Sequence, residues 1–135
     1  MTRTTKLIYS HLITAVIALC AGLVFLAFLL RPQTLEIDHV DLNRVFDGAY
    51  IGVCQNKILF AVVKVVVKDH RISTIEILGH KASYRAQAEQ IAEHVCAEQS
   101  LEVAAISGAT LTSDTVLKAI ENALEDGAKA SHWTK

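Results

Sequence analysis

An unbroken apolar run near the N-terminus constrains this 135-residue chain more than any other feature. Between Leu12 and Leu30 there are no charged residues, and Thr14 is the only polar side chain. A helix rises about 1.5 Å per residue, so this run of nineteen residues spans roughly 28 Å, close to the thickness of a bilayer's hydrocarbon core. The run therefore predicts one N-terminal transmembrane helix within residues 1–31.

The charges on either side of this run indicate its orientation. Arg3 and Lys6 precede it, whereas a single Arg31 and then mostly acidic charged residues follow it. Basic residues stay preferentially on the cytoplasmic side of a membrane. We therefore expect a single-pass protein of the cell (plasma) membrane, with a short cytoplasmic N-terminal tip and an extracytoplasmic C-terminal domain. A cleaved signal peptide is the alternative, although its apolar core is usually only about 7 to 15 residues long.

The remaining composition excludes several classes of protein. The chain has 13 basic and 14 acidic residues, and two of the basic ones precede the apolar run. The part beyond the run is therefore net acidic, which argues against a nucleic-acid partner. The histidines and cysteines lack the usual ligand spacings, so we expect no metal site. Cys54 and Cys96 either form a disulfide in an oxidising compartment or remain buried free thiols.

Periodicity beyond the apolar run predicts two strands. Residues 32–45 form a polar connector in this interpretation, and the Asp-Gly turn at Asp47 opens the domain. A β-branched strand is expected over 58–67 and a second over 72–78, joined antiparallel by a short turn. The first strand does not alternate in polarity, so we expect both of its faces to be covered.

Two amphipathic helices are expected after the strands. Apolar residues recur with helical spacing from 84 to 99, and again from about Asp114 to a C-terminal cap at Gly127. The predicted fold class is therefore α+β: a small antiparallel-rich sheet with two packed helices, preceded by the transmembrane helix. The predicted divisions are an anchor at 1–31, a connector at 32–45, a domain at 46–128 and a tail at 129–135.

The second of these helices is preceded by "SGATLTS", residues 107–113, a segment with four hydroxyl groups. Helix capping explains one or two of them, because Thr112 or Ser113 can accept hydrogen bonds from first-turn amides. Gly108 and Ala109 keep the neighbourhood of Thr110 free of bulk. A helix N-terminus with free amides and nearby hydroxyls also suits a phosphate, so a phosphate-bearing ligand and a purely structural turn both stay open.

Three ordered motifs resemble the FMN-binding domain family. They are "DGAYIG" at 47–52, "VVVKDHRISTIEILGH" at 65–80 and "EQSLEVAAISGATLTSDTVLKAIENAL" at 98–124. The family includes the G subunit of the Rnf ion-translocating complex and the C subunit of the sodium-translocating NADH:quinone reductase. The similarity covers roughly Phe46 to Leu124, which is nearly all of the expected outer domain.

This resemblance implies a covalent FMN. In the family, a separate magnesium-dependent flavin transferase uses FAD to attach FMN, through its phosphate, to the threonine that ends the Ser-Gly-Ala-Thr run, here Thr110. An unassisted threonine hydroxyl is a poor nucleophile, so the transferase must supply the base and the metal. The resemblance also marks further cofactor-binding candidates, namely Ser107, Gly108, Ala109, Leu111, Thr112, Ser113 and, at the end of the second motif, His80.

The function implied by the resemblance is electron transport by a carrier, not catalysis by an independent enzyme with catalytic residues of its own. Its expected partners are membrane lipid, the flavin transferase, and an unidentified membrane or extracytoplasmic electron donor and acceptor. One departure matters: family members often have an aspartate six positions before the modified threonine, where this chain has Ala104. Glu102 lies two residues away and would point the same way on a strand. A membrane-tethered ligand-binding or interaction module without covalent flavin therefore remains the alternative.

Overall fold

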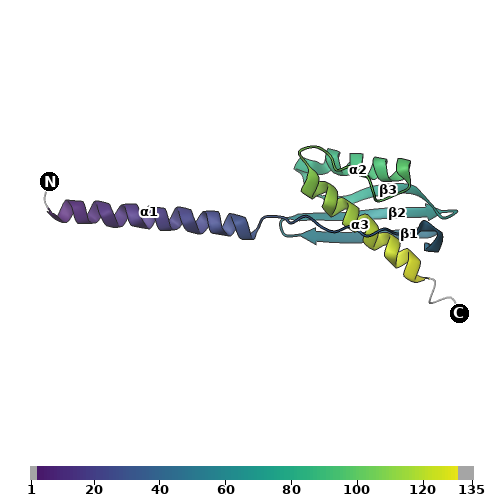
Figure 1. The fold of residues 1–135 in the computed structure, drawn as a ribbon, viewed down its shortest axis with the longest axis horizontal. Helices are drawn as coiled ribbons and strands as arrows, with labels where there is room; N and C mark the ends of the chain where they lie inside the picture. The colour runs from purple at the N-terminus through teal and green to yellow at the C-terminus, as the bar shows by residue number, and fades with distance from the viewer. Residues whose placement is uncertain (1–2, 131–135) are drawn as a thin grey trace. The chain divides into compact units, whose positions relative to one another are not determined.

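The computed structural model describes residues 3–130, and the chain divides into two compact units, Met1–Arg31 and Pro32–Lys135. The first unit is the single helix α1, Arg3–Leu29 (Figure 1). Its stretch Thr4–Leu29 is long and apolar enough to cross a membrane, and its large apolar side chains are exposed. A signal sequence near an N-terminus shares this length and composition. The predicted N-terminal apolar helix is confirmed.

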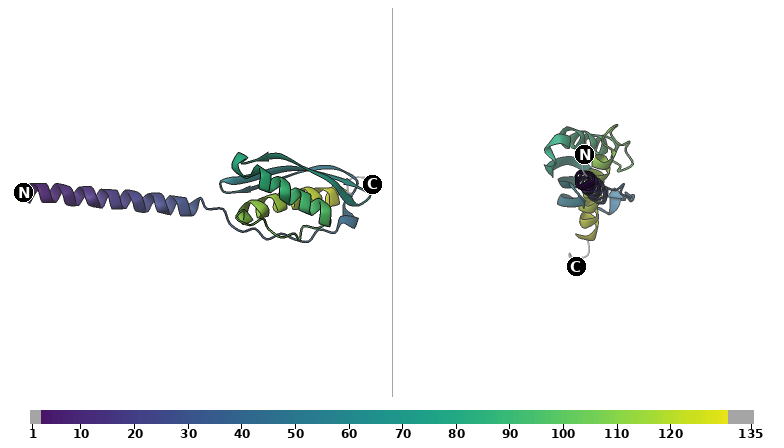
Figure 2. Two further views of the ribbon diagram at one scale, coloured as in Figure 1. Left: turned by 90° about the horizontal axis from the view of Figure 1, so that it is seen from above. Right: turned by 90° about the vertical axis from the view of Figure 1, so that its left-hand side faces the viewer.

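The second unit is a three-stranded antiparallel sheet with two helices on one face. β1 (Gly48–Asn56), β2 (Leu59–Lys68) and β3 (Arg71–His80) lie side by side in that order. Helices α2 (Arg85–Glu98) and α3 (Thr110–Lys129) cover the same face, as Figure 2 shows. Short 3-10 turns, η1 (Leu42–Arg44) and η2 (Ala82–Tyr84), precede β1 and α2. The predicted α+β class is confirmed.

The hydrophobic core lies between the sheet and the two helices. Every second residue of β2 points into it, including Val63, Val65 and Val67, which are buried. Ile91 of α2 and Ile120 of α3 meet them from the helical side and are fully buried. A single layer of helices over one face of a sheet gives this small domain one continuous core.

The outer face of the sheet corrects one expectation. The β-branched run of β2 predicts cover on both faces, but Val62, Lys64 and Val66 on the outer face are only half buried. On β1, Ile51 and Val53 are more than half exposed. The strand is apolar on both sides, yet the described helices cover only one of them. The sequence shows that both faces of the strand are apolar. Burial of the outer face would also require a second layer of helices or strands on that side of the sheet.

Helix α3 approaches β1 so closely that no side chain fits between them at Gly52. A Cβ added there would overlap the carbonyl oxygen of Ala119 and lie 2.8 Å from the backbone nitrogen of Ala123. Further along the helix, Gly127 lies against the side chain of Tyr50, near the start of β1. α3 therefore begins at the end of the sheet where β1 ends and runs back toward the start of β1 (Figure 1).

The connector packs on the domain instead of hanging free. The side-chain amide of Asn56, at the end of β1, accepts a hydrogen bond from the backbone N–H of Gln33 at 3.0 Å and donates one to its carbonyl. Lys118 of α3 donates to the carbonyl of Glu36 at 3.1 Å. The buried carboxylate of Glu121 accepts from Lys118 at 2.7 Å. The structure thus includes residues 32–45 in the same compact unit as the sheet, while residues 131–135 of the expected tail lie outside the described part.

The first residue of "DGAYIG" has a structural role. Asp69 and His70, the two residues of the β2–β3 turn, both have positive φ, as in the tight turns that suit twisted hairpins. The carboxylate of Asp47 accepts a hydrogen bond from the backbone N–H of His70 at 3.3 Å. Hydrogen bonds from the backbones of Asp69 and His70 hold the pKa of Asp47 below its usual value. Asp47, at the start of the domain, therefore holds the β2–β3 turn.

The contact at Gly52 predicts a severe effect of a single methyl group. We expect Gly52→Ala to lower the free energy of unfolding by about 3 kcal/mol or more, because the methyl group would collide with rigid helix backbone. Gly79→Ala is the matched control, since its added Cβ would only reach ordinary contact, 3.4 Å, with the side chains of Phe60 and Val62. Chemical denaturation of the full chain in detergent micelles, followed by circular dichroism, measures both. Equal stability of the two variants would contradict the close approach of α3 and β1.

Candidate functional site

The "SGATLTS" segment forms a tight turn that runs directly into α3. The backbone N–H of Ala109 donates to the carbonyl of Ile106 at 2.9 Å, which closes a four-residue turn. Gly108 has a φ of +76°, and an added Cβ would meet no atom within 4 Å. Glycine is therefore required at this position by the backbone conformation and not by lack of space.

The side chain of Ser113 holds this turn against the helix. Its hydroxyl donates to the carbonyl of Ala109 at 2.9 Å and accepts from the backbone N–H of Ile106 at 3.1 Å. Ser113 is fully buried, so these bonds are made away from water. Both ends of the turn are thus fixed to one side chain in the first turns of α3. Any contact of Ser113 with a flavin phosphate stays a prediction.

The start of α3 corrects the helix boundary expected from capping. The helix begins at Thr110, four residues before Asp114, and Ala109 occupies the N-cap position without a side-chain cap. Thr112 and Ser113 lie inside the helix and do not cap it. Capping preferences point to hydroxyl residues, but here the glycine turn at Gly108 sets the point at which the helix starts. Within residues 3–130, the backbone N–H groups of Thr110, Leu111 and Thr112 consequently lack acceptors, whereas that of Ser113 donates to the carbonyl of Ala109.

Thr110 is the first residue of this uncapped helix, and its side chain is exposed. Within residues 3–130, its hydroxyl has no hydrogen-bond partner. The second threonine of the motif differs sharply, since Thr112 is only 2% exposed. Ser107 and Gly108 are exposed, Leu111 is half buried and Ala109 is buried. Of the two threonines in the segment, only Thr110 is therefore exposed, and it lies at the uncapped start of α3.

His80 is an unusual buried residue at the end of β3. It is 8% exposed, and its Nδ1 lies 2.6 Å from the carbonyl oxygen of Phe60, which accepts the Nδ1 proton. Burial lowers the pKa of His80, the Phe60 carbonyl opposes this change, and the charge of Arg85 adds to it. The lowered pKa of His80 favours the neutral imidazole, in which Nε2 carries a lone pair. Among the described residues, this Nε2 is buried without a hydrogen-bond partner.

Two acidic positions near the turn have different surroundings. Glu102, which stands near the missing family aspartate, is exposed, and its carboxylate lies 3.6 Å from Nδ1 of His39 in the connector. Residues 102–106 are not a strand, so the alternation argument for Glu102 does not apply. Sequence reasoning gave Asp114 no role at the site. Burial raises the pKa of Asp114, and the backbone N–H of Leu35 in the connector opposes that rise. No local pattern marks this contact, because the two residues are far apart in sequence.

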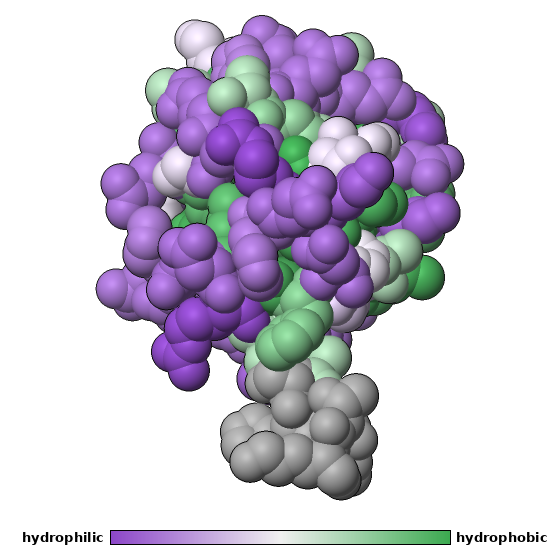
Figure 3. Space-filling model, turned by 90° about the vertical axis from the view of Figure 1, so that its right-hand side faces the viewer, coloured by the Kyte–Doolittle hydropathy of each residue, from purple (hydrophilic) through white to green (hydrophobic). Residues whose placement is uncertain are grey.

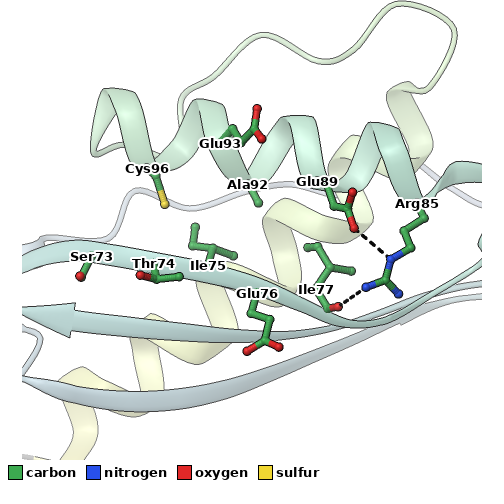
Figure 4. Close-up of a pocket in the computed structure, with 10 residues that line it drawn as sticks. All are labelled: Ser73, Thr74, Ile75, Glu76, Ile77, Arg85, Glu89, Ala92, Glu93 and Cys96. Carbon is green, nitrogen blue, oxygen red and sulfur yellow. Dashed lines mark hydrogen bonds and ion pairs between the residues drawn. The ribbon is translucent and has the colours of Figure 1, made fainter.

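A hollow of about 460 Å³ lies elsewhere, between β3 and α2. Its polar side chains include Arg85, which donates to Glu89 and to the carbonyl of Ile77 (Figure 4). The Glu76 side chain points away from α2, and Glu93 lies on the helix above the strand (Figure 4). None of the residues that line this hollow belongs to "SGATLTS". The hollow and the turn at Thr110 are therefore separate features.

The cysteines and acidic residues of the described part do not form a second site. Cys54 and Cys96 are free thiols, which settles the alternative left open by the sequence. Burial raises the pKa of both thiols. In residues 3–130, no group of three or more histidine, cysteine, aspartate or glutamate side chains is placed to hold a metal ion.

Comparison with known protein families identifies the domain. Residues 60–125, from β2 into α3, match the family model described as FMN-binding domain. This part of the chain, 66 of the 135 residues, is similar to the FMN-binding domain family. The match includes His80 and the whole turn from Ser107 to Ser113. No curated protein and no solved structure shows significant similarity to the chain.

The residues present in this FMN-binding domain fit the group it is named for. A phosphate needs donors that are not already used, and the uncapped first turn of α3 supplies backbone N–H groups beside Thr110. FMN also carries N–H and hydroxyl donors, and Nε2 of His80 is a buried acceptor without a donor. Bound FMN would supply one- and two-electron redox chemistry, while the domain holds and orients it.

The two bonds of Ser113 predict its contribution to stability. Ser113→Ala removes the acceptor of the Ile106 N–H, and we expect a loss of about 1–3 kcal/mol in the free energy of unfolding. Ser107→Ala is the control in the same motif, and because Ser107 is exposed we expect its effect to stay within about 0.5 kcal/mol. Denaturant titration measures both, and amide hydrogen exchange at Ile106 should accelerate only in the first variant. Unchanged exchange at Ile106 in Ser113→Ala would show that this hydroxyl does not hold the turn.

Proposed function

We propose that this protein is a membrane-anchored, extracytoplasmic electron carrier whose FMN is esterified through its phosphate to Thr110. The observation that carries the proposal is the position of Thr110: within an FMN-binding domain, it is an exposed hydroxyl at an uncapped helix N-terminus. α1 supports the membrane anchor by its length and apolar composition. The two basic residues before the apolar run, Arg3 and Lys6, against the single Arg31 directly after it support an outer location for the domain.

Attachment requires a nucleophilic substitution at phosphorus. The Thr110 hydroxyl oxygen forms a bond to the phosphorus of the FMN half of FAD, the phosphoanhydride bond of FAD breaks, and AMP leaves. The threonine proton passes to a base of the flavin transferase, whose Mg²⁺ stabilises the charge on the phosphate oxygens. The domain contributes access, since Gly108 and Ala109 place no bulky side chain next to Thr110. No electrons are exchanged in this step.

After attachment, the domain's own groups hold the phosphate and orient the cofactor. The first-turn amides of α3 would hold a phosphate on Thr110, because free backbone N–H groups at a helix N-terminus favour negative charge. Ser107 lies at the exposed entrance of the turn, and Leu111 follows Thr110 on the helix. His80 offers Nε2 as a hydrogen-bond acceptor for a donor of the cofactor. None of these groups is arranged as a nucleophile with its base, which favours a carrier over an independent enzyme.

Mass spectrometry tests the attachment. When the chain is coexpressed with an active flavin transferase, we expect its intact mass to rise by the mass of FMN less one water, with flavin fluorescence in the denatured gel band. Thr110→Ala should abolish both signals. Thr112→Val is the control, because its buried hydroxyl is two residues away and out of reach, and it should keep both signals. An unmodified intact mass beside an active transferase would reject covalent attachment and favour the tethered module without covalent flavin, for which Ala104 is the argument.

Topology is tested separately. A protease added to intact cells should cleave the region after Arg31, because that region is proposed to lie outside the membrane. The mature intact mass should include residues 1–31, which a signal peptidase would remove. Disruption of the cells serves as the control for protease activity on the folded domain. Protection of the region after Arg31 in intact cells would overturn the orientation, and a mature mass without residues 1–31 would overturn the anchor.

A further inference from the structure

The outer face of the sheet carries an apolar patch at one end. We define the outer patch as five residues from the three strands and the β1–β2 turn: Val53, Ile58, Phe60, Val62 and Leu78. Four of these large side chains are 44–55% exposed, and Val62 is half buried. An apolar cluster of this kind on a soluble surface indicates an interaction site.

The patch is continuous across the strands. Val53 of β1 stands opposite Val62 of β2, and Val62 stands opposite Gly79 of β3. A Cβ at Gly79 would touch the side chains of both Phe60 and Val62 at 3.4 Å, so these two side chains flank the same position. Val53, Phe60 and Val62 therefore form one surface, and Ile58 and Leu78 lie close to this surface in the chain, two residues before Phe60 and directly before Gly79.

Beyond the patch the outer face is mixed, since exposed Ile51 stands opposite Lys64. Further along the same face, Lys64 stands opposite Glu76, so the face becomes charged toward the middle of the sheet. The far end of the domain, where β2 meets β3, is covered largely by hydrophilic side chains (Figure 3). Lysines are present at the patch end as well, where Lys57 and Lys81 are exposed. Exposed apolar side chains with a lysine rim are typical of surfaces that dock on anionic lipid bilayers.

Only a short stretch of chain separates α1 from this end of the sheet. Asn56, which directly precedes Lys57 and Ile58, holds both backbone groups of Gln33. Gln33 is two residues after Arg31, and two residues span at most about 7 Å. This limit follows from the covalent chain, whatever the orientation of the two units. If α1 crosses a bilayer, the β1–β2 turn therefore cannot move far from the lipid headgroups.

We propose that the outer patch docks on the lipid surface of the membrane that anchors the chain. This inference rests on the membrane anchor of the proposed function. Insertion of Ile58, Phe60 and Leu78 into the headgroup region removes apolar surface from water, and Lys57 and Lys81 face the lipid phosphates. α3 begins at this same end of the sheet (Figure 1), so docking keeps Thr110 and the turn before it at the membrane surface. The redox partner is then a molecule at that surface and not one in bulk solvent.

Tryptophan quenching by brominated lipid tests the docking in the full chain. The single native tryptophan is replaced by Trp133→Phe, and one tryptophan is introduced by Ile58→Trp in the patch. Lys68→Trp is the matched control, because it lies at the opposite end of β2 and is also exposed. Both proteins are reconstituted into vesicles of phosphatidylcholine and phosphatidylglycerol, with and without bromine on the acyl chains. We expect the emission of the Ile58→Trp protein to shift to shorter wavelength and to lose most of its intensity in brominated vesicles, with no change for the Lys68→Trp protein.

The outcomes separate the docking from the anchor on which it rests. Release of the protein from vesicles by alkaline carbonate would show that the anchor fails. Retention of the protein with equal, unquenched emission of both variants would overturn the docking alone. A blue shift of the Ile58→Trp protein without lipid quenching, dependent on the protein-to-lipid ratio, would also overturn it, because a second copy would then cover the patch. Flavin attachment is measured independently by mass, so its failure leaves the quenching result interpretable.

Discussion

The contact of α3 with β1 at Gly52 determines where the turn that precedes Thr110 lies. At this point helix backbone meets strand backbone, and no flexible side chain absorbs a displacement. Thr110 precedes Ala119 by nine residues, or roughly 14 Å along a helix. A helix is stiff over this length, so the position set at Gly52 is transmitted to Thr110. Lys118 and Glu121, which flank Ala119 on α3, form an ion pair, and Lys118 also donates to the carbonyl of Glu36, which fixes the connector to the same helix.

Much of the fold could be predicted from the sequence because its signals are local. The helical spacing of Ala88, Ile91 and Val95 identifies the buried face of α2, and all three are buried. The β-branched run of β2 identifies a strand, and the short turn at Asp69 and His70 identifies an antiparallel hairpin. The exposed position of Thr110 also agrees with its small neighbours Gly108 and Ala109. In each case the determining residues lie within one turn or one strand of each other.

The remaining features depend on contacts between distant parts of the chain. Capping rules place the helix start at a hydroxyl residue, but Ser113 uses its hydroxyl to hold Ile106 and Ala109, and the helix starts earlier. Asn56 binds Gln33 across 23 positions, so the connector appeared to be free polar chain in the sequence. The cover of β2 depends on a second layer that the described part of the chain does not supply. Local sequence patterns cannot predict these features, because each depends on contacts between elements that are not adjacent in the chain or on the presence of another layer.

The architecture suits the proposed electron carrier because the residues that fix the turn differ from those proposed to bind the cofactor. The groups that fix the turn, Ser113 and the α3–β1 contact, are buried and already satisfied by the protein. The groups proposed to bind the cofactor are the Thr110 hydroxyl and the first-turn amides. Within residues 3–130, they do not take part in fixing the turn. A deep cavity would shield a cofactor from its electron donor and acceptor, whereas a turn on an open surface leaves it within reach of both. If α1 crosses a membrane, as proposed, the short path from Arg31 to the Gln33–Asn56 contact keeps that surface near the membrane.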